Sequence, residues 1–179
     1  MKRRMIQMVM VLTMAFTSVT VAGAAEEGKP VAAVARPGPP PMSADAMKAF
    51  LARPLVARLA TVRRNSTPQI VPMWFFYEDG VLYMSTRTSA AKLRHLRQNP
   101  HVAVVIDVME APLKNKAVTI EGTAEVLTTG VKEMTTKIYR KYVGAEADTN
   151  PRAQASINTP RVILKITPKK IQTMDTTGS

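Results

Sequence analysis

The sequence predicts a mainly β protein of the α+β class, in which six antiparallel strands curl into a small barrel with helices at its periphery. Short runs rich in apolar and β-branched residues follow one another, and turn residues separate them. The predicted order is helix, three strands, helix, two strands, helix and strand, which lacks the strand–helix alternation of a doubly wound parallel sheet. Glycines mark sharp bends, with Gly80 in a hairpin and Gly122 inside a strand.

The first half of the predicted domain is a helix followed by three strands. Ser43 is expected to cap the helix, and Pro54 to end it. We expect the strands at residues 56–62, 69–77 and 81–86. Pro72 falls inside the second strand and cannot donate a backbone hydrogen bond. This residue is therefore expected at a sheet edge, at a bulge or at a break that faces a ligand.

The second half alternates helices with the remaining strands. We expect a helix at 90–98, strands at 102–106 and 117–127, a helix at 130–142, a loop or short helical turn at 145–160, and a last strand at 161–166. Ser89 and Thr129 are expected to cap the two helices, and Gly144 to close the second one. Gly122 predicts a bulge or a sharp bend in its strand.

The N-terminal residues 1–25 have the pattern of a signal peptide. Residues 2–4 are basic, residues 5–21 are mostly apolar, and residues 22–25 are small. The apolar stretch of about 17 residues is at the lower limit for a membrane span, so we expect cleavage and no stable membrane insertion afterwards. The protein is thus expected to be exported, to the periplasm or outside the cell, by the general secretory or the twin-arginine route.

Residues 26–42 are rich in proline and alanine and are expected to form a linker. The folded domain is expected over residues 43–176. The chain has no cysteine, which excludes disulfides and thiolate metal sites. Its two histidines, His95 and His101, have no partner ligands at metal spacing, so we expect no metal site, and we expect His95 at the surface.

The formal net charge is +12, part of which comes from the basic residues at the N-terminus. A basic surface attracts phosphates, nucleic acids or anionic lipids without choosing among them. No basic helix is interleaved with aromatic residues, so nucleic-acid binding is not expected. The sequence also contains no nucleophile elbow, phosphate loop or paired-carboxylate pattern, and the catalytic residues stay unassigned.

One segment, residues 86–100, carries a family resemblance. A strand ends at Thr86, a turn contains Ser89 and Lys92, and the following helix ends in Asn99-Pro100. This segment resembles the phosphate-binding turn and helix of the pyridoxamine 5'-phosphate oxidase superfamily. Other segments also resemble that superfamily, and those at 59–62 and 68–75 resemble its branch that uses FMN or the deazaflavin coenzyme F-420; the later matching segments are 118–124 and 161–168.

The resemblance spans roughly residues 44–175 and implies a split β-barrel that forms a homodimer and binds FMN or coenzyme F-420. It implies that phosphate would be held by Ser85, Thr86, Arg87, Ser89 and Lys92. It also implies that backbone groups of Val71, Pro72 and Met73 would contact the flavin ring, and that Trp74 would shield the ring or line the substrate pocket. Physical chemistry agrees with the first group, because hydroxyls and cations near a helix N-terminus bind phosphate well.

The sequence departs from the family pattern at two points, and these limit which properties of the family can be expected of this chain. Ala91 stands where the family has an arginine, so one phosphate contact is missing or is supplied by Arg87 or Arg94. The chain also ends soon after Pro168, without the C-terminal segment of the true oxidase, and oxidation of vitamin B6 phosphates is therefore not expected.

Three functions remain open from the sequence. The first is an oxidoreductase that transfers hydride between its cofactor and a small substrate. The second is a non-catalytic protein that binds flavin or haem, and the third is a basic envelope protein without a cofactor. For two of the candidate site residues, a purely structural role is an alternative to cofactor binding. Lys92 would then be a solvated helix lysine, and Trp74 a core residue.

Overall fold

The computed structural model describes residues 38–39 and 41–177. The expected signal peptide at 1–25 lies outside the described residues, as does most of the expected linker. Within the described part of the chain, no helix is long and apolar enough to cross a membrane.

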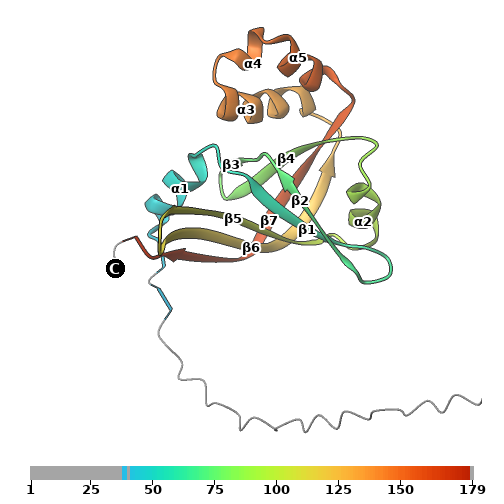
Figure 1. Cartoon of the computed structure of the whole chain (residues 1–179). Helices are drawn as coiled ribbons and strands as arrows, with labels where there is room; N and C mark the ends of the chain where they lie inside the picture. Colours follow the sequence, from blue (N-terminus) through green and yellow to red (C-terminus); the bar gives the residue numbers. More distant parts are fainter. Residues whose placement is uncertain (1–37, 40, 178–179) are drawn as a thin grey trace, which may run out of the picture. The chain divides into compact units, whose positions relative to one another are not determined.

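A seven-stranded antiparallel sheet forms the body of the domain, with helices at its periphery (Figure 1). The strands are β1 (Ala57–Val62), β2 (Pro68–Met73), β3 (Phe76–Glu78), β4 (Val81–Arg87), β5 (His101–Ala111), β6 (Lys114–Leu127) and β7 (Arg161–Asp175). The helices are α1 (Ala44–Ala52), α2 (Lys92–Gln98), α3 (Val131–Val143), α4 (Glu146–Thr149) and α5 (Pro151–Asn158). The order of strands across the sheet is β2-β1-β5-β6-β7-β4-β3, so the predicted mainly antiparallel fold is confirmed.

The strand count differs from the prediction because the expected strand at 69–77 is divided. Strand β2 ends at Met73, strand β3 begins at Phe76, and Trp74 and Phe75 lie between them without strand pairing. Strand β2 is an edge strand that pairs only with β1 among the described strands. Of the three positions expected for Pro72, the sheet edge is the one observed: this proline of β2 stands opposite Arg58 of β1.

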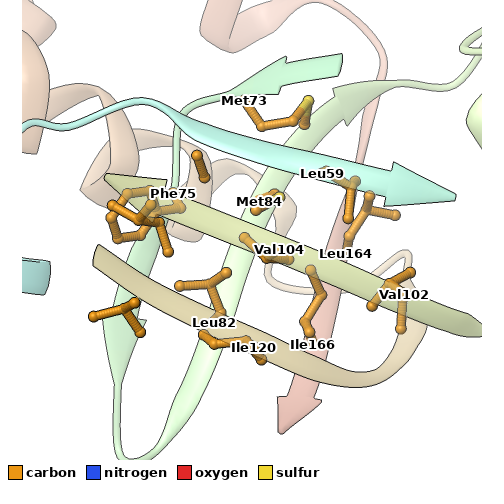
Figure 2. Packing of buried hydrophobic residues seen from close by; sticks show 14 of the residues in the cluster. Leu59, Met73, Phe75, Leu82, Met84, Val102, Val104, Ile120, Leu164 and Ile166 are labelled. Carbon is orange, nitrogen blue, oxygen red and sulfur yellow. The ribbon is translucent and has the colours of Figure 1, made fainter. Parts of the chain in front are cut away.

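The core fills the inside of the curled sheet (Figure 2). Alternate residues of the strands point inward, as in β1, where Ala57, Leu59 and Thr61 are buried. Figure 2 shows apolar side chains from several strands meeting there, and they include Leu59, Met73, Leu82, Met84, Val104, Ile120, Leu164 and Ile166. Burial of this apolar surface is the main force that holds the barrel together.

Strands β5, β6 and β7 are longer than predicted, and a bulge interrupts the pairing of β6 with β7. The last strand continues to Asp175, because β6 pairs with it far beyond the predicted end at Ile166. The register shifts between Glu121 and Gly122, opposite an extra residue of β7, which confirms the bulge expected at Gly122. A Cβ atom at Gly122 would lie 2.3 Å from the carbonyl oxygen of Thr167.

Helices α3, α4 and α5 form a small helical layer. Gly144 closes α3 with φ of 62°, as predicted. Thr129 does not cap this helix; Gly130, in the left-handed conformation, precedes its first turn instead. The expected loop or short turn at 145–160 contains the two helices α4 and α5, and Asn150 caps α5 by accepting hydrogen bonds from the backbone N–H groups of Arg152 and Ala153.

Helix α2 also departs from the prediction at its start. It begins at Lys92 rather than at Ala90, and its N-cap is Ala91, so Ser89 lies in the preceding turn and does not cap the helix. His95 is buried rather than at the surface. Its Nδ1 atom lies 3.1 Å from the hydroxyl of Thr61, a partner from strand β1 that helical spacing does not reveal.

Candidate functional site

The turn between β4 and α2 holds a half-buried lysine beside a buried hydroxyl. Thr86 lies on the inward face of β4, and the Nζ atom of Lys92 donates to its Oγ1 atom at 3.1 Å. Burial lowers the pKa of Lys92. No carboxylate forms an ion pair with Lys92 among the residues that the structure describes. A partly desolvated cation without a carboxylate partner is a good site for an anion.

The remaining predicted residues of the turn are accessible. Arg87 and Ser89 are exposed and bracket the turn that leads to Lys92. Backbone hydrogen bonds already engage the N–H groups of Ala90, which donates to Arg87, and of Leu93, which donates to Ala90. An anion at this turn would therefore be held mainly by side-chain cations and hydroxyls.

Ser85 points away from this group, because neighbouring residues of a strand face opposite sides of the sheet. Its Oγ atom lies 2.8 Å from the hydroxyl of Thr135 in α3. It also accepts a hydrogen bond from the Nη1 atom of Arg161 at 3.3 Å. Ser85 thus connects β4 to α3 and β7, while Thr86 faces Lys92.

The other predicted group, on β2, is separate from the turn. Val71 is half-buried against the core, Pro72 is exposed, and the side chain of Met73 is buried. Within the described residues, no hydrogen bond or ion pair joins these residues or Trp74 to the group around Lys92.

Trp74 is 37% exposed, so the alternative of a core residue is wrong. Its ring stacks on Tyr142, with centroids 4.5 Å apart and planes 4° apart. Tyr139 meets the same indole edge-on, with a centroid distance of 5.2 Å and an interplanar angle of 71°. Trp74 turns outward at the break between β2 and β3 because its neighbour Phe75 fills the core.

Two hydrogen bonds fix Tyr142 behind the indole. Its hydroxyl donates to the carbonyl of Leu55 at 2.6 Å and accepts from the backbone N–H of Phe75 at 3.1 Å. Burial raises the pKa of Tyr142 to about 12, so the hydroxyl remains a donor well into the alkaline range. The stacked pair is consequently held from both the barrel and helix α3.

Trp74 also lines a cavity of about 450 Å³ against the helical layer. The cavity wall includes Trp74, Tyr139, Val143, Glu146, Asn150, Arg152, Ala153 and Ser156. Apart from Trp74, these residues were not predicted as site residues. The three-residue spacing of Tyr139 and Tyr142 places both tyrosines on one face of α3. This spacing is the sequence pattern that could have indicated an aromatic cluster on the helix.

Lys141, next to Tyr142, connects α3 to the end of α1. Its Nζ atom donates to the carbonyl of Leu51 at 2.7 Å and lies 3.4 Å from the centroid of the Phe75 ring. Both contacts favour the charged amine. Burial is the larger effect, however, and lowers the pKa of Lys141 to about 7.

Replacing Lys141 with methionine is expected to remove a pH-dependent part of the stability. The pKa of this lysine is about 7 in the folded protein and has its ordinary value of 10.5 in the unfolded chain. Between these values the unfolded chain binds a proton that the folded protein does not, so the free energy of unfolding rises with pH. Urea unfolding across this pH interval is expected to show a smaller rise for Lys141→Met than for the wild type.

The control is Lys132→Met, which changes an exposed lysine of the same helix. This variant is expected to keep the wild-type rise of stability with pH. Equal pH dependence for the wild type and Lys141→Met would show that Lys141 titrates normally in the folded protein.

Comparison with known proteins identifies the fold and the family. A conserved hypothetical protein from Mycobacterium tuberculosis has a TM-score of 0.66 and 23% identity, over 75% of this chain and 85% of the other. An F420 reductase has a TM-score of 0.56 and 28% identity, over 69% of this chain and 94% of the other. An FAD and haem binding protein from Mycobacterium smegmatis has a TM-score of 0.61 and 16% identity, over 76% of this chain and 72% of the other.

No curated protein matches the chain. The family model of pyridoxamine 5'-phosphate oxidase matches residues 43–175, which is most of the chain and the whole of the barrel with its helices. This chain therefore belongs to the pyridoxamine 5'-phosphate oxidase family of split barrels.

Proposed function

We propose that this protein binds a flavin-type cofactor, FMN or coenzyme F-420, and holds its phosphate at the turn between β4 and α2. The observation that carries the proposal is the contact of Lys92 with Thr86, which places a partly desolvated cation and a buried hydroxyl side by side. Arg87 and Ser89 are exposed on the same turn and add a cation and a hydroxyl. This donor set fits a phosphate, which accepts several charge-assisted hydrogen bonds.

The flavin ring is proposed to lie along the edge strand β2, against backbone groups of Val71, Pro72 and Met73. An edge strand has backbone groups that no neighbouring strand engages, and Pro72 has no N–H to donate. The bound cofactor would supply hydride transfer at N5 of FMN or C5 of F-420. The residues of this chain would bind the cofactor, orient its ring and shape the site of a small-molecule substrate.

Titration of the purified protein with FMN and with F-420, followed by cofactor fluorescence, tests this function. Saturable binding of one cofactor is expected, and it identifies the cofactor for a substrate screen. The F420 reductase described above supports F-420, and the FAD and haem binding protein supports a flavin. Failure of both to bind would overturn the proposed function and leave the fold unaffected.

The alternative is a non-catalytic carrier of flavin or haem. It is favoured by structural similarity to the FAD and haem binding protein described above and to a haem storage protein from Vibrio cholerae. Reduction or oxidation of the bound cofactor by a small substrate would distinguish the oxidoreductase from the carrier.

We also propose that the protein is exported through a cleaved signal peptide.

A homodimer is also proposed, with the outer face of β2, β1 and β5 as its interface. Ile70 is 65% exposed there and pairs with Ala60, which pairs in turn with Ala103. These apolar side chains surround a shallow hollow, and an ion pair between Arg58 and Asp107 borders it. An exposed apolar row on the outer face of a sheet is a favourable surface for a second copy.

Ile70→Lys is expected to convert the dimer to a monomer. Two copies related by a two-fold axis would each bring the new charge into an apolar interface, where desolvation of the ammonium is costly. Light scattering measures the molecular mass. Leu113→Lys, which changes an 88% exposed leucine in the turn between β5 and β6, is expected to remain dimeric. A dimeric Ile70→Lys variant would place the interface elsewhere.

A further inference from the structure

The cavity beside Trp74 shares no lining residue with the turn between β4 and α2. It lies between the break that separates β2 from β3 and the helical layer α3–α5. Its volume of about 450 Å³ is sufficient for a small ring compound. We propose that this cavity binds a planar aromatic carboxylate. This proposal rests on the proposed function, because such a compound would be the small substrate of the oxidoreductase.

The aromatic wall of the cavity is rigid before any ligand arrives. Trp74 and Tyr139 line the cavity, while Tyr142 stacks on the indole without lining it. Tyr142 is fixed in turn by its hydrogen bonds to Leu55 and Phe75. A ring that binds against Trp74 and Tyr139 therefore meets aromatic side chains whose positions are already set, and little conformational freedom is lost on binding.

The helices on the opposite side are also fixed by hydrogen bonds. Arg140 of α3 makes a two-point ion pair with Asp148 of α4, with N–O distances of 3.0 Å each. Gln154 of α5 donates to the carbonyl of Ala147 at 2.7 Å. The Nε atom of Arg161 donates to the carbonyl of Ser156 at 2.6 Å. The cavity is thus a feature of the packed layer rather than of a single loop.

Two charged residues of this wall have no ion-pair partner within the described part of the chain: Arg152 and Glu146. Arg140 and Asp148, which belong to the same helical layer, neutralise each other. The guanidinium of Arg152 can therefore bind a carboxylate in the two-point geometry that arginine favours. Glu146 is left to accept a hydrogen bond from a donor group on the ligand.

The surrounding charge favours an acid over an amine as the ligand. Without residues 1–25, which carry three basic residues and no acidic one, the formal net charge is still +9, and Arg161 lies 6.0 Å from the centroid of the Tyr139 ring. The potential at the cavity is therefore expected to be positive, which attracts a negatively charged ligand. The aromatic wall favours a flat ring, and the positive potential favours an acid. Together these two features favour an aromatic carboxylate.

The chain contains one tryptophan, Trp74, so its intrinsic tryptophan fluorescence reports directly on this cavity. The probe is benzoate, added to the whole protein without cofactor, with calorimetry as a second measurement. Benzoate is expected to change the tryptophan emission in a saturable way. Cyclohexanecarboxylate, which lacks the flat ring, and benzylamine, which lacks the acid, are expected to bind at least tenfold more weakly. Equal binding of the three compounds, or no binding of benzoate, would overturn the proposal.

Arg152→Gln is the decisive variant. It is expected to weaken benzoate at least tenfold and to leave the midpoint of thermal unfolding unchanged, since Arg152 is exposed. The matched control is Arg97→Gln, which removes an exposed arginine from α2 and is expected to bind benzoate as the wild type does. Identical benzoate affinity in the two variants would exclude Arg152 and overturn the proposal.

The same samples are titrated with FMN and F-420, so the two proposals fail separately. Benzoate binding without cofactor binding would retain the cavity as an aromatic carboxylate site and reject the flavin function. Cofactor binding without benzoate binding would reject the cavity proposal alone.

Discussion

Gly122→Ala is expected to destabilise the barrel strongly. The added Cβ atom would lie 2.3 Å from the carbonyl oxygen of Thr167 and 3.2 Å from the Cα atom of Pro168. Both are backbone atoms of β7, so no side-chain rotation relieves the clash. The two longest strands would have to separate at their bulge, and we expect a loss of about 3 kcal/mol in the free energy of unfolding, the upper part of the usual range for overpacking.

The free energy is measured by urea unfolding of the wild type and the variant. Gly38→Ala makes the same chemical change where a Cβ atom would meet nothing within 4 Å, and it is expected to leave the unfolding midpoint unchanged. A Gly122→Ala variant as stable as Gly38→Ala would show that β6 and β7 do not approach closely at the bulge. Loss of soluble Gly122→Ala protein alone, with normal yields of Gly38→Ala, would agree with the expected destabilisation.

The sequence predicted the strands well where their observed length matches the local alternation of apolar residues. Alternation of apolar residues located β1 and β4 to within about one residue, and the Asp79-Gly80 turn marked the hairpin of β3 and β4. The break at Trp74 was missed, because a run of apolar and aromatic residues continues through it. Only the three-dimensional context shows that Phe75 fills the core while Trp74 turns to α3.

Features that depend on distant partners were predicted less well. Strand β7 extends to Asp175 because β6 offers a long partner, although Pro168 and the lysines that follow it give no strand pattern of their own. His95 has polar and basic neighbours along its helix, yet Thr61 of β1 provides a buried partner for its ring. Neither contact can be inferred from spacing along the chain.

In the candidate site, too, the features set by local sequence were predicted and those set by distant partners were not. The six-residue separation of Thr86 and Lys92 placed them on either side of a turn, and the structure brings their side chains into contact. Ser85 was grouped with them, but strand alternation turns it to the opposite face, where Thr135 and Arg161 bind it. Trp74 was expected to shield the ring or line a substrate pocket, but the helical wall of its cavity was not predicted, since α4 and α5 were expected to be a loop or short helical turn.

Lys92→Met is expected to cause the largest loss of cofactor affinity. The variant removes the half-buried cation at the proposed phosphate site while keeping the length and apolar stem of the side chain. Loss of one charge-assisted hydrogen bond costs about 1–3 kcal/mol, which corresponds to an increase of about 5- to 150-fold in the dissociation constant. The constant is measured by cofactor fluorescence, and Lys48→Met, on the exposed face of α1, is the control with unchanged affinity.

The pH dependence of binding tests whether the charge of Lys92 is what matters. Because burial lowers the pKa of this lysine, the free protein loses the cation at a lower pH than an exposed lysine would. Cofactor affinity of the wild type is therefore expected to fall on the alkaline side, whereas that of Lys92→Met stays low and nearly constant there. Lys92→Arg keeps a charge that does not titrate in this range, so it is expected to bind without the alkaline fall. If Lys92→Met bound the cofactor as tightly as the wild type, Lys92 would be only a structural partner of Thr86, and the phosphate would have to be held by Arg87 or Arg94.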